Sequence, residues 1–266
     1  FTPSNYISKR VQVKGRDGVM IPVSLIYKKG QVLSNRPMLL YGYGAYGSTI
    51  GPHFLKYVIP LIDRGVVYAI AHIRGGSIKG DKWHDSGRYF NKMNTFNDFI
   101  DVAKHYIHTG VTTPEKLAIK GESAGGLLMG TVLNMAPELF KLAIMQVPFV
   151  DVLNTMTLYY DPLAKYEKKE WGDGLVKKEY DLIKSYDPYT NISKQNYPTI
   201  WVETGFEDTA VYYFQPMKWV AKMREVNNPK NSKPVLFSTT FKGGHSGNSG
   251  VEGKEKKYAK SFSFLL

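Results

Sequence analysis

The chain alternates short apolar runs with longer stretches in which apolar residues recur at helical spacing. A short continuous apolar run is typical of a strand that is covered on both faces of a parallel sheet. Such runs predict six buried strands, at 38–41, 66–73, 117–119, 142–147, 199–202 and 235–239. Ahead of them, 6–13 and 20–27 alternate in polarity, and the turn residues of 14–18 predict that they form a hairpin.

Helices are predicted between these strands. The main helical stretches are 54–64, 96–108, 127–135 and 211–225. Thr95, with Asp98 three residues later, predicts a capping-box start that uses Asp in place of Glu. This alternation of strands and helices predicts an α/β fold. The irregular segment 151–198 is too long for a simple crossover, and we interpret it as a cap or substrate-binding region.

Composition narrows the functional classes. At 266 residues the chain can bury a large core, and its lack of cysteine excludes disulfides and thiolate chemistry. The net charge of +12 suggests nucleic acid as a partner, but the lysines are dispersed and no nucleic-acid-binding motif accompanies them. We therefore predict no nucleic-acid partner. With no apolar run long enough for a membrane span and no signal-peptide pattern, we also predict no membrane partner and a cytoplasmic location.

The most informative segment is GESAGG at 121–126. It follows the apolar run at 117–119 and opens the helical stretch at 127–135. Strand, Gly-x-Ser-x-Gly and helix in this order are typical of the nucleophile elbow of α/β-hydrolases. The pattern predicts Ser123 as a nucleophile and the Ala124 N–H as a donor to an oxyanion.

A serine nucleophile needs a base and a carboxylate that orients the base. In α/β-hydrolases the acid follows the serine and the histidine comes last, and His245 is the only histidine after Ser123. Asp208 follows a predicted strand and is the favoured acid. The alternatives left open are Glu203, Glu207 and Asp151.

The loop YGYGAYG at 41–47 follows the first buried strand and is expected to supply a second oxyanion donor. Its glycines allow close approach of the backbone, and Tyr43 offers a phenolic O–H. Because the sequence has no His/Cys cluster, we predict neither a metal site nor a cofactor.

Taken together, these segments resemble the catalytic domain of the prolyl oligopeptidase family of serine peptidases, and within it the oligopeptidase B branch. The resemblance covers nearly the whole chain. It rests on 41–47, 63–65, 72–76, 94–98, 123–130, 146–152, 170–172, 185–189, 218–222 and 244–245.

The resemblance implies one catalytic domain over 1–266, with a mostly parallel eight-stranded sheet and helices on both faces. It implies a Ser123, Asp208, His245 triad, with Tyr43 and Ala124 forming the oxyanion hole. It further implies cleavage of short peptides after Arg or Lys, with Glu167 and Tyr46 as substrate-binding residues.

Three departures qualify this expectation. Lys169 stands where the branch tends to carry an acid, and it should repel a basic substrate. Ala210 replaces the arginine that proline-specific relatives carry two residues after the acid, which argues against strict prolyl specificity. The β-propeller that precedes the domain in the family is absent from this chain, so a propeller from the full-length protein or another chain is an expected partner. A carboxylesterase and an inactive interaction domain remain the alternative functions.

Overall fold

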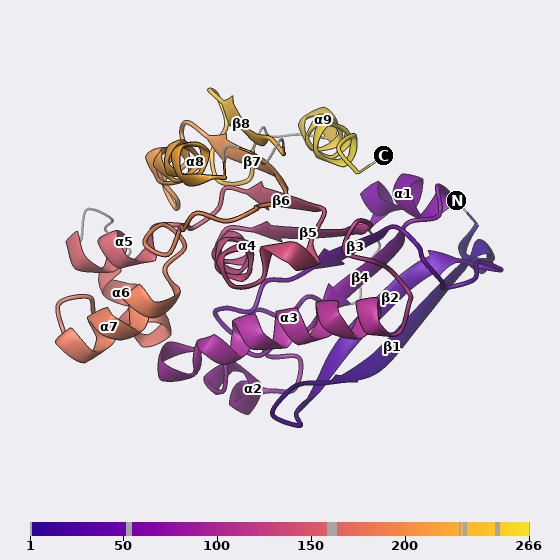
Figure 1. Ribbon diagram of the computed structural model, residues 1–266, viewed down its shortest axis with the longest axis horizontal. Helices are drawn as coiled ribbons and strands as arrows, with labels where there is room; N and C mark the ends of the chain where they lie inside the picture. Colours follow the sequence, from indigo (N-terminus) through magenta and orange to yellow (C-terminus); the bar gives the residue numbers. More distant parts are fainter. Residues whose placement is uncertain are drawn as a thin grey trace.

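The fold is built on one twisted sheet. The computed structural model describes residues 2–51, 55–158, 164–228, 230, 233–247 and 251–265. Eight strands lie in the order β1-β2-β4-β3-β5-β6-β7-β8, and helices cover both faces (Figure 1). The strands are β1 (Tyr6–Lys14), β2 (Met20–Lys28), β3 (Met38–Tyr41), β4 (Val67–Ala71), β5 (Leu117–Glu122), β6 (Leu142–Gln146), β7 (Thr199–Gly205) and β8 (Val235–Thr240).

The predicted hairpin and the six predicted buried strands are all present. The pair β1 and β2 is antiparallel, β2 also runs antiparallel to β4, and the remaining strands are parallel. Strands β3, β4 and β6 are buried almost throughout, as continuous apolar runs require.

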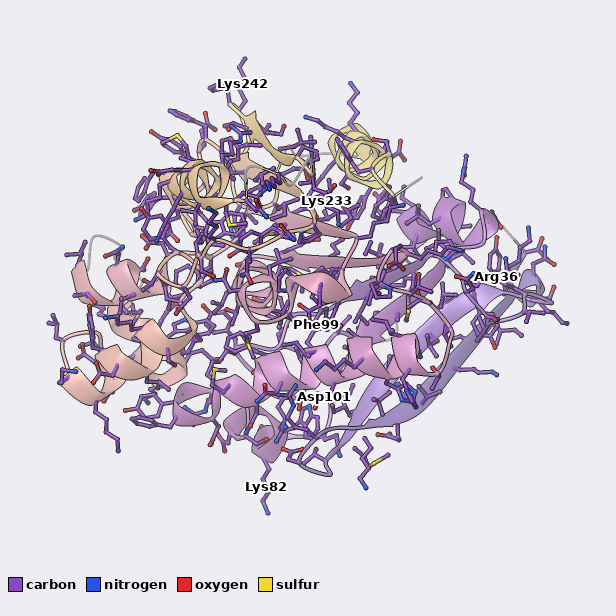
Figure 2. The ribbon with its side chains drawn as sticks, in the orientation of Figure 1. Arg36, Lys82, Phe99, Asp101, Lys233 and Lys242 are labelled. Atoms are coloured by element: carbon purple, nitrogen blue, oxygen red, sulfur yellow. The ribbon has the colours of Figure 1, made fainter. Side chains whose placement is uncertain are left out.

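Two apolar cores lie on the two faces of the sheet. The larger contains side chains of α3 (Met93–His108), α4 (Ala124–Met135) and α8 (Phe214–Val226). Phe99, labelled in Figure 2, points from α3 into this core, whereas Lys82 and Lys242 project outward on opposite sides of the molecule. The smaller core lies under α1 (Ile59–Asp63) and α9 (Val251–Phe262), which are neighbours in Figure 1.

The long segment after β6 forms a helical group of its own. It contains α5 (Val152–Leu158), α6 (Ala164–Trp171) and α7 (Lys177–Tyr186), at the left of Figure 1. A short helix, α2 (Asp81–Asp85), and a 3-10 turn, η3 (Tyr89–Asn91), lie before α3. Two more 3-10 turns, η1 (Pro3–Asn5) and η4 (Pro137–Leu139), precede β1 and β6.

The helix predicted at 54–64 is shorter than expected. Its first residue lies outside the described residues, and the rest forms the 3-10 turn η2 (Lys56–Val58) followed by α1. Pro60 is in the first turn of α1. Since proline has no N–H to continue a preceding helix but fits a first turn, it marks this restart.

Three other predicted helix starts were wrong. Helix α4 begins at Ala124, three residues before the predicted start. Helix α3 begins at Met93, and Thr95 does not cap it, because its hydroxyl donates to the carbonyls of Arg74 and Gly87 at 2.9 and 2.8 Å. Helix α8 begins at Phe214, three residues after the predicted start. There the N–H of Val211 donates to the carboxylate of Asp208, which holds this stretch in a turn.

The chain reverses direction along the sheet between β3 and β5. From β3 it moves to β4 on one side, and then returns to β5 on the other side. Loops that leave neighbouring strands at such a switch point leave room for a ligand at the carboxyl edge of the sheet. The loops after β3, β5, β7 and β8 all reach this edge, and they contain Tyr43, Ser123, Asp208 and His245.

Candidate active site

Ser123 lies at a strained turn between β5 and α4. Its φ of 55° and ψ of −119° are costly for a residue with a side chain, by about 1–3 kcal/mol. A Cβ at Gly121 would lie 2.1 Å from the carbonyl oxygen of Gly125, so only glycine fits at that position. The Ser123 N–H donates to Gln146 O at 2.9 Å, and its carbonyl accepts from Phe149 N at 3.0 Å. The sheet therefore holds the predicted elbow in its strained form.

Asp208 and His245 meet across the ends of β7 and β8. The Asp208 side chain is fully buried, and its Oδ2 lies 2.8 Å from His245 Nδ1. The other carboxylate oxygen, Oδ1, accepts the N–H groups of Ala210 and Val211, both at 2.9 Å. A carboxylate at Nδ1 favours a proton there, which leaves Nε2 as the basic nitrogen of the imidazole.

The three alternative acids are occupied or exposed elsewhere. Glu203 accepts a hydrogen bond from Gln146 Nε2 at 2.6 Å. Asp151 forms an ion pair with Lys218, and Glu207 is exposed. Among the four carboxylates, the structure places Asp208 against the candidate base.

Tyr43 and Ala124 lie beside Ser123 at the switch point. The phenol of Tyr43 is close enough to the Ser123 side chain for the serine to influence its pKa. Burial raises the pKa of this phenol, so it keeps its proton and can donate. Ala124 is the first residue of α4, where backbone N–H groups have no acceptor within the helix. A Cβ at Gly125 would lie 2.8 Å from Gly42 O, so glycine allows the tyrosine loop to pack directly on α4.

Glu167 and Tyr46 are also in contact. The Tyr46 hydroxyl donates to Glu167 Oε2 at 3.0 Å, and the indole Nε1 of Trp171 donates to the same oxygen at 2.8 Å. The rings of Tyr46 and Trp171 meet edge to face, with centroids 5.4 Å apart. The predicted substrate-binding carboxylate on α6 is therefore fixed against the loop that contains Tyr43.

Lys169 lies on a different side of α6 from Glu167. Its side chain is exposed, and its carbonyl accepts a hydrogen bond from Arg88 at 2.6 Å. Residues two positions apart on a helix do not face each other. The repulsion of a basic substrate that the sequence predicts would therefore act from the far side of the helix.

Sequence reasoning missed three polar residues next to this site. Lys92, Glu170 and His84 lie around the 42–47 loop, and Lys92 and Glu170 are buried. Glu170 Oε1 accepts the Tyr46 N–H at 2.9 Å, and its Oε2 lies 2.8 Å from His84 Nε2. Lys92 lies just before α3, where a charged residue gives no sequence signal of burial, and Glu170 stands in the sequence only within the motif at 170–172.

Metal-ligand groups and membrane-spanning helices can be assessed over the part of the chain that the structure describes. Its residues bring together no group of three His, Asp or Glu side chains suited to a metal ion. None of its helices is long and apolar enough to cross a membrane.

The fold and the geometry of the elbow define an α/β-hydrolase of the serine type. The prolyl oligopeptidase family model matches residues 52–266, and the chain belongs to this family. Dipeptidyl aminopeptidase BI of Pseudoxanthomonas mexicana is 44% identical over all of this chain, and Protease 2 of Moraxella lacunata is 43% identical over 99% of it.

Solved structures agree with this placement. Oligopeptidase B from Leishmania major matches 98% of the chain with 42% identity and a TM-score of 0.90. Oligopeptidase B from Trypanosoma brucei, in a closed form with covalently bound antipain, matches all of it with 40% identity and a TM-score of 0.93. The chain covers 36% and 37% of these two structures, and 37% and 38% of the two sequence relatives above. The match therefore concerns one part of longer proteins.

Proposed function

We propose that this chain is the catalytic part of a serine oligopeptidase that cleaves short peptides after Arg or Lys. The observation that carries the proposal is the 2.8 Å contact between buried Asp208 and His245, at the same sheet edge as the strained elbow of Ser123. A serine, an imidazole and a buried carboxylate on three neighbouring loops are the groups that acyl transfer requires.

In the proposed mechanism, Ser123 Oγ attacks the scissile carbonyl while His245 Nε2 takes its proton. Asp208 keeps the imidazole in the required tautomer and stabilises its protonated form. The negative charge that develops on the carbonyl oxygen is held by the Ala124 N–H and the Tyr43 O–H. His245 then gives its proton to the leaving amine, and water releases the acyl group by the reverse sequence of proton transfers.

The proposed preference for a basic P1 side chain rests on Glu167. A guanidinium or ammonium that leaves water needs a carboxylate partner, and two donors already fix the orientation of Glu167. Glu167 also influences Tyr43 electrostatically, since its charge adds to the burial that raises the pKa of the phenol. The relatives named oligopeptidase B and Protease 2 are consistent with a peptidase at this site.

The first test is covalent labelling of the purified protein with a fluorophosphonate probe. We expect the wild-type protein to be labelled and Ser123→Ala to remain unlabelled, because the probe reacts with an activated serine. Ser185→Ala, which removes an exposed hydroxyl that donates to Leu182 O on α7, is the matched control and should be labelled like wild type. Labelling of the Ser123 variant would refute the assignment.

A second measurement separates peptidase from esterase. The assay uses an amide and an ester of an arginyl substrate, and an amide and an ester of a simple acyl group. We expect the protein to hydrolyse the arginyl amide. Turnover of simple aryl esters alone would favour a carboxylesterase, and a folded protein without any turnover would favour an interaction domain.

A further inference from the structure

The loop that contains Tyr43 is held at its main chain by two buried charged residues. Lys92 Nζ donates to Gly44 O at 2.7 Å and to Gly87 O at 3.2 Å. Glu170 Oε1 accepts the Tyr46 N–H at 2.9 Å. The contacts at Gly44 and Tyr46 fall within three residues of Tyr43, whose phenol is proposed to hold the oxyanion.

The environment of Lys92 is unusual for an ammonium group. The residue is 1% exposed, and its Nζ lies 4.9 Å from the centroid of the Trp171 ring and 6.0 Å from that of Phe96. Isolated charges in such places are costly, and an apolar side chain of similar volume would fill the space at lower cost. A lysine here therefore needs a reason beyond packing, and its contact with the Gly44 carbonyl supplies one.

Glu170 and Trp171 connect the 42–47 loop with helix α6. Glu170, 5% exposed, lies on α6 one turn after Glu167 and reaches the loop at Tyr46 N. Trp171, next to it, contacts Lys92 through its ring and Glu167 through its indole nitrogen. The loop at the oxyanion hole and the helix at the predicted P1 pocket are thus connected through Lys92, Glu170 and Trp171.

We propose that Lys92 and Glu170 are positioning residues that set the place of the Tyr43 hydroxyl in the oxyanion hole. This inference rests on the proposed function. A donor stabilises a developing oxyanion only if it is in place before the reaction, because rearranging it during the reaction costs part of the gain. Fixing the main chain at Gly44 and Tyr46 limits how far Tyr43 can move.

The experiment is a double-mutant cycle with Lys92→Met and Tyr43→Phe. It measures the second-order rate constant of fluorophosphonate labelling, and kcat and KM for an ester substrate. If Lys92 acts through Tyr43, Lys92→Met should lower the labelling rate and kcat by about tenfold while KM stays within about twofold. In the Tyr43→Phe background the same change should cost less than about twofold. Lys104→Met, on the exposed face of α3, is the matched control and should behave like wild type.

The dependence on pH gives a readout that a purely structural role would not move. Burial lowers the pKa of Lys92 to about 8, and the charge of Glu170 opposes this shift. The other titratable groups around Glu170 and the loop are Glu167 on α6, His84 on α2, Tyr43 and Tyr46 in the loop, and Tyr186 on α7. Since the ammonium is the form that binds Gly44 O most strongly, the labelling rate should fall as the pH rises through about 8.

Glu170→Gln provides the second variant. Its amide oxygen can still accept the Tyr46 N–H, but its negative charge is gone, so the pKa of Lys92 should fall further. We expect the alkaline decline to move to lower pH in Glu170→Gln and to be absent in Lys92→Met. If circular dichroism shows that Lys92→Met does not fold, the pH profile of Glu170→Gln tests the positioning role by itself.

Two results would overturn the inference. One is an equal loss from Lys92→Met with and without the Tyr43 hydroxyl. The other is a lower melting temperature with unchanged labelling and an unchanged alkaline decline in both variants. A wild-type protein that is not labelled at all would instead refute the proposed function, and the inference with it.

Discussion

Residues that are neighbours on one helix can serve different parts of a site. Glu167 and Glu170 lie one turn apart on α6, and both bind Tyr46, one at its hydroxyl and the other at its main-chain N–H. Side chains three apart share a helix face, so the two carboxylates reach the same loop. The proposed roles are substrate recognition for Glu167 and loop positioning for Glu170, because Glu170 is the more deeply buried of the two.

Glu167→Gln should separate these two roles. We expect kcat/KM for an arginyl peptide to fall at least tenfold, because the basic side chain loses a charged partner. Turnover of a matched peptide with a neutral P1 residue should change less than about threefold. Steady-state kinetics on both peptides measure this difference.

Asp181→Asn, which neutralises an exposed carboxylate on α7, is the control for a general charge effect. It should leave both peptides unchanged. An equal loss on both peptides in Glu167→Gln would mean that Glu167 does not recognise P1.

At the scale of elements, contacts with other parts of the chain changed the start of α3. Asp98, predicted to cap this helix, instead accepts hydrogen bonds from the backbone and guanidinium of Arg74, at distances from 2.5 to 3.2 Å. Arg74 follows β4, and its guanidinium also contacts Asp17 at 2.7 Å. The buried pair thus connects α3 with the loop after β4, whose glycine Gly75 packs against the carbonyl of Gly44.

Asp98→Ala should therefore be strongly destabilising. Removing one partner leaves the buried guanidinium without its main carboxylate, and we expect the free energy of unfolding to fall by about 3 kcal/mol. Denaturant titration followed by circular dichroism measures this.

Asp181→Ala, which breaks the exposed pair with Lys177, is the comparison. Its expected effect is about 0.5 kcal/mol. Similar effects of the two substitutions would show that the Arg74–Asp98 pair is not a major tie between β4 and α3.

At the scale of the whole molecule, the sheet is stabilised from two sides by cores of different size. The smaller core, under α1 and α9, includes Phe262 from the last helix against Leu61 and Ile62 from the first. These two helices are far apart in the sequence and lie side by side in Figure 1. Helix α9 is thus needed to cover this face of the sheet.

Phe262→Ala should lower the free energy of unfolding by about 3 kcal/mol, because it removes a large side chain that is 6% exposed. Phe241→Ala, at a position 71% exposed, should change it by less than about 0.5 kcal/mol. Thermal and denaturant unfolding of both variants measure the difference. Equal stability of the two variants would contradict a second core closed by α9.

The sequence by itself determined the strands, the elbow and the order of the candidate triad. Short continuous apolar runs are typical of strands covered on both faces of a sheet, and the runs 38–41 and 142–147 predicted β3 and β6 almost to the residue. The glycines around Ser123 predict the elbow because they give the backbone the freedom that this turn needs. The single histidine after Ser123 predicts the base because it fits the order of the triad along the chain.

Only the tertiary structure decided which polar groups are buried together. Tyr46 and Glu170 are 124 positions apart in the chain. The sequence around Lys92, just before α3, and Asp98, within α3, does not distinguish them from exposed charged residues, and only their partners in the fold do. Charged groups are buried where packing supplies acceptors and donors for them, and that packing joins elements that no local pattern relates. For this reason the candidate nucleophile could be predicted from the sequence, whereas the residues that hold the proposed oxyanion loop could not.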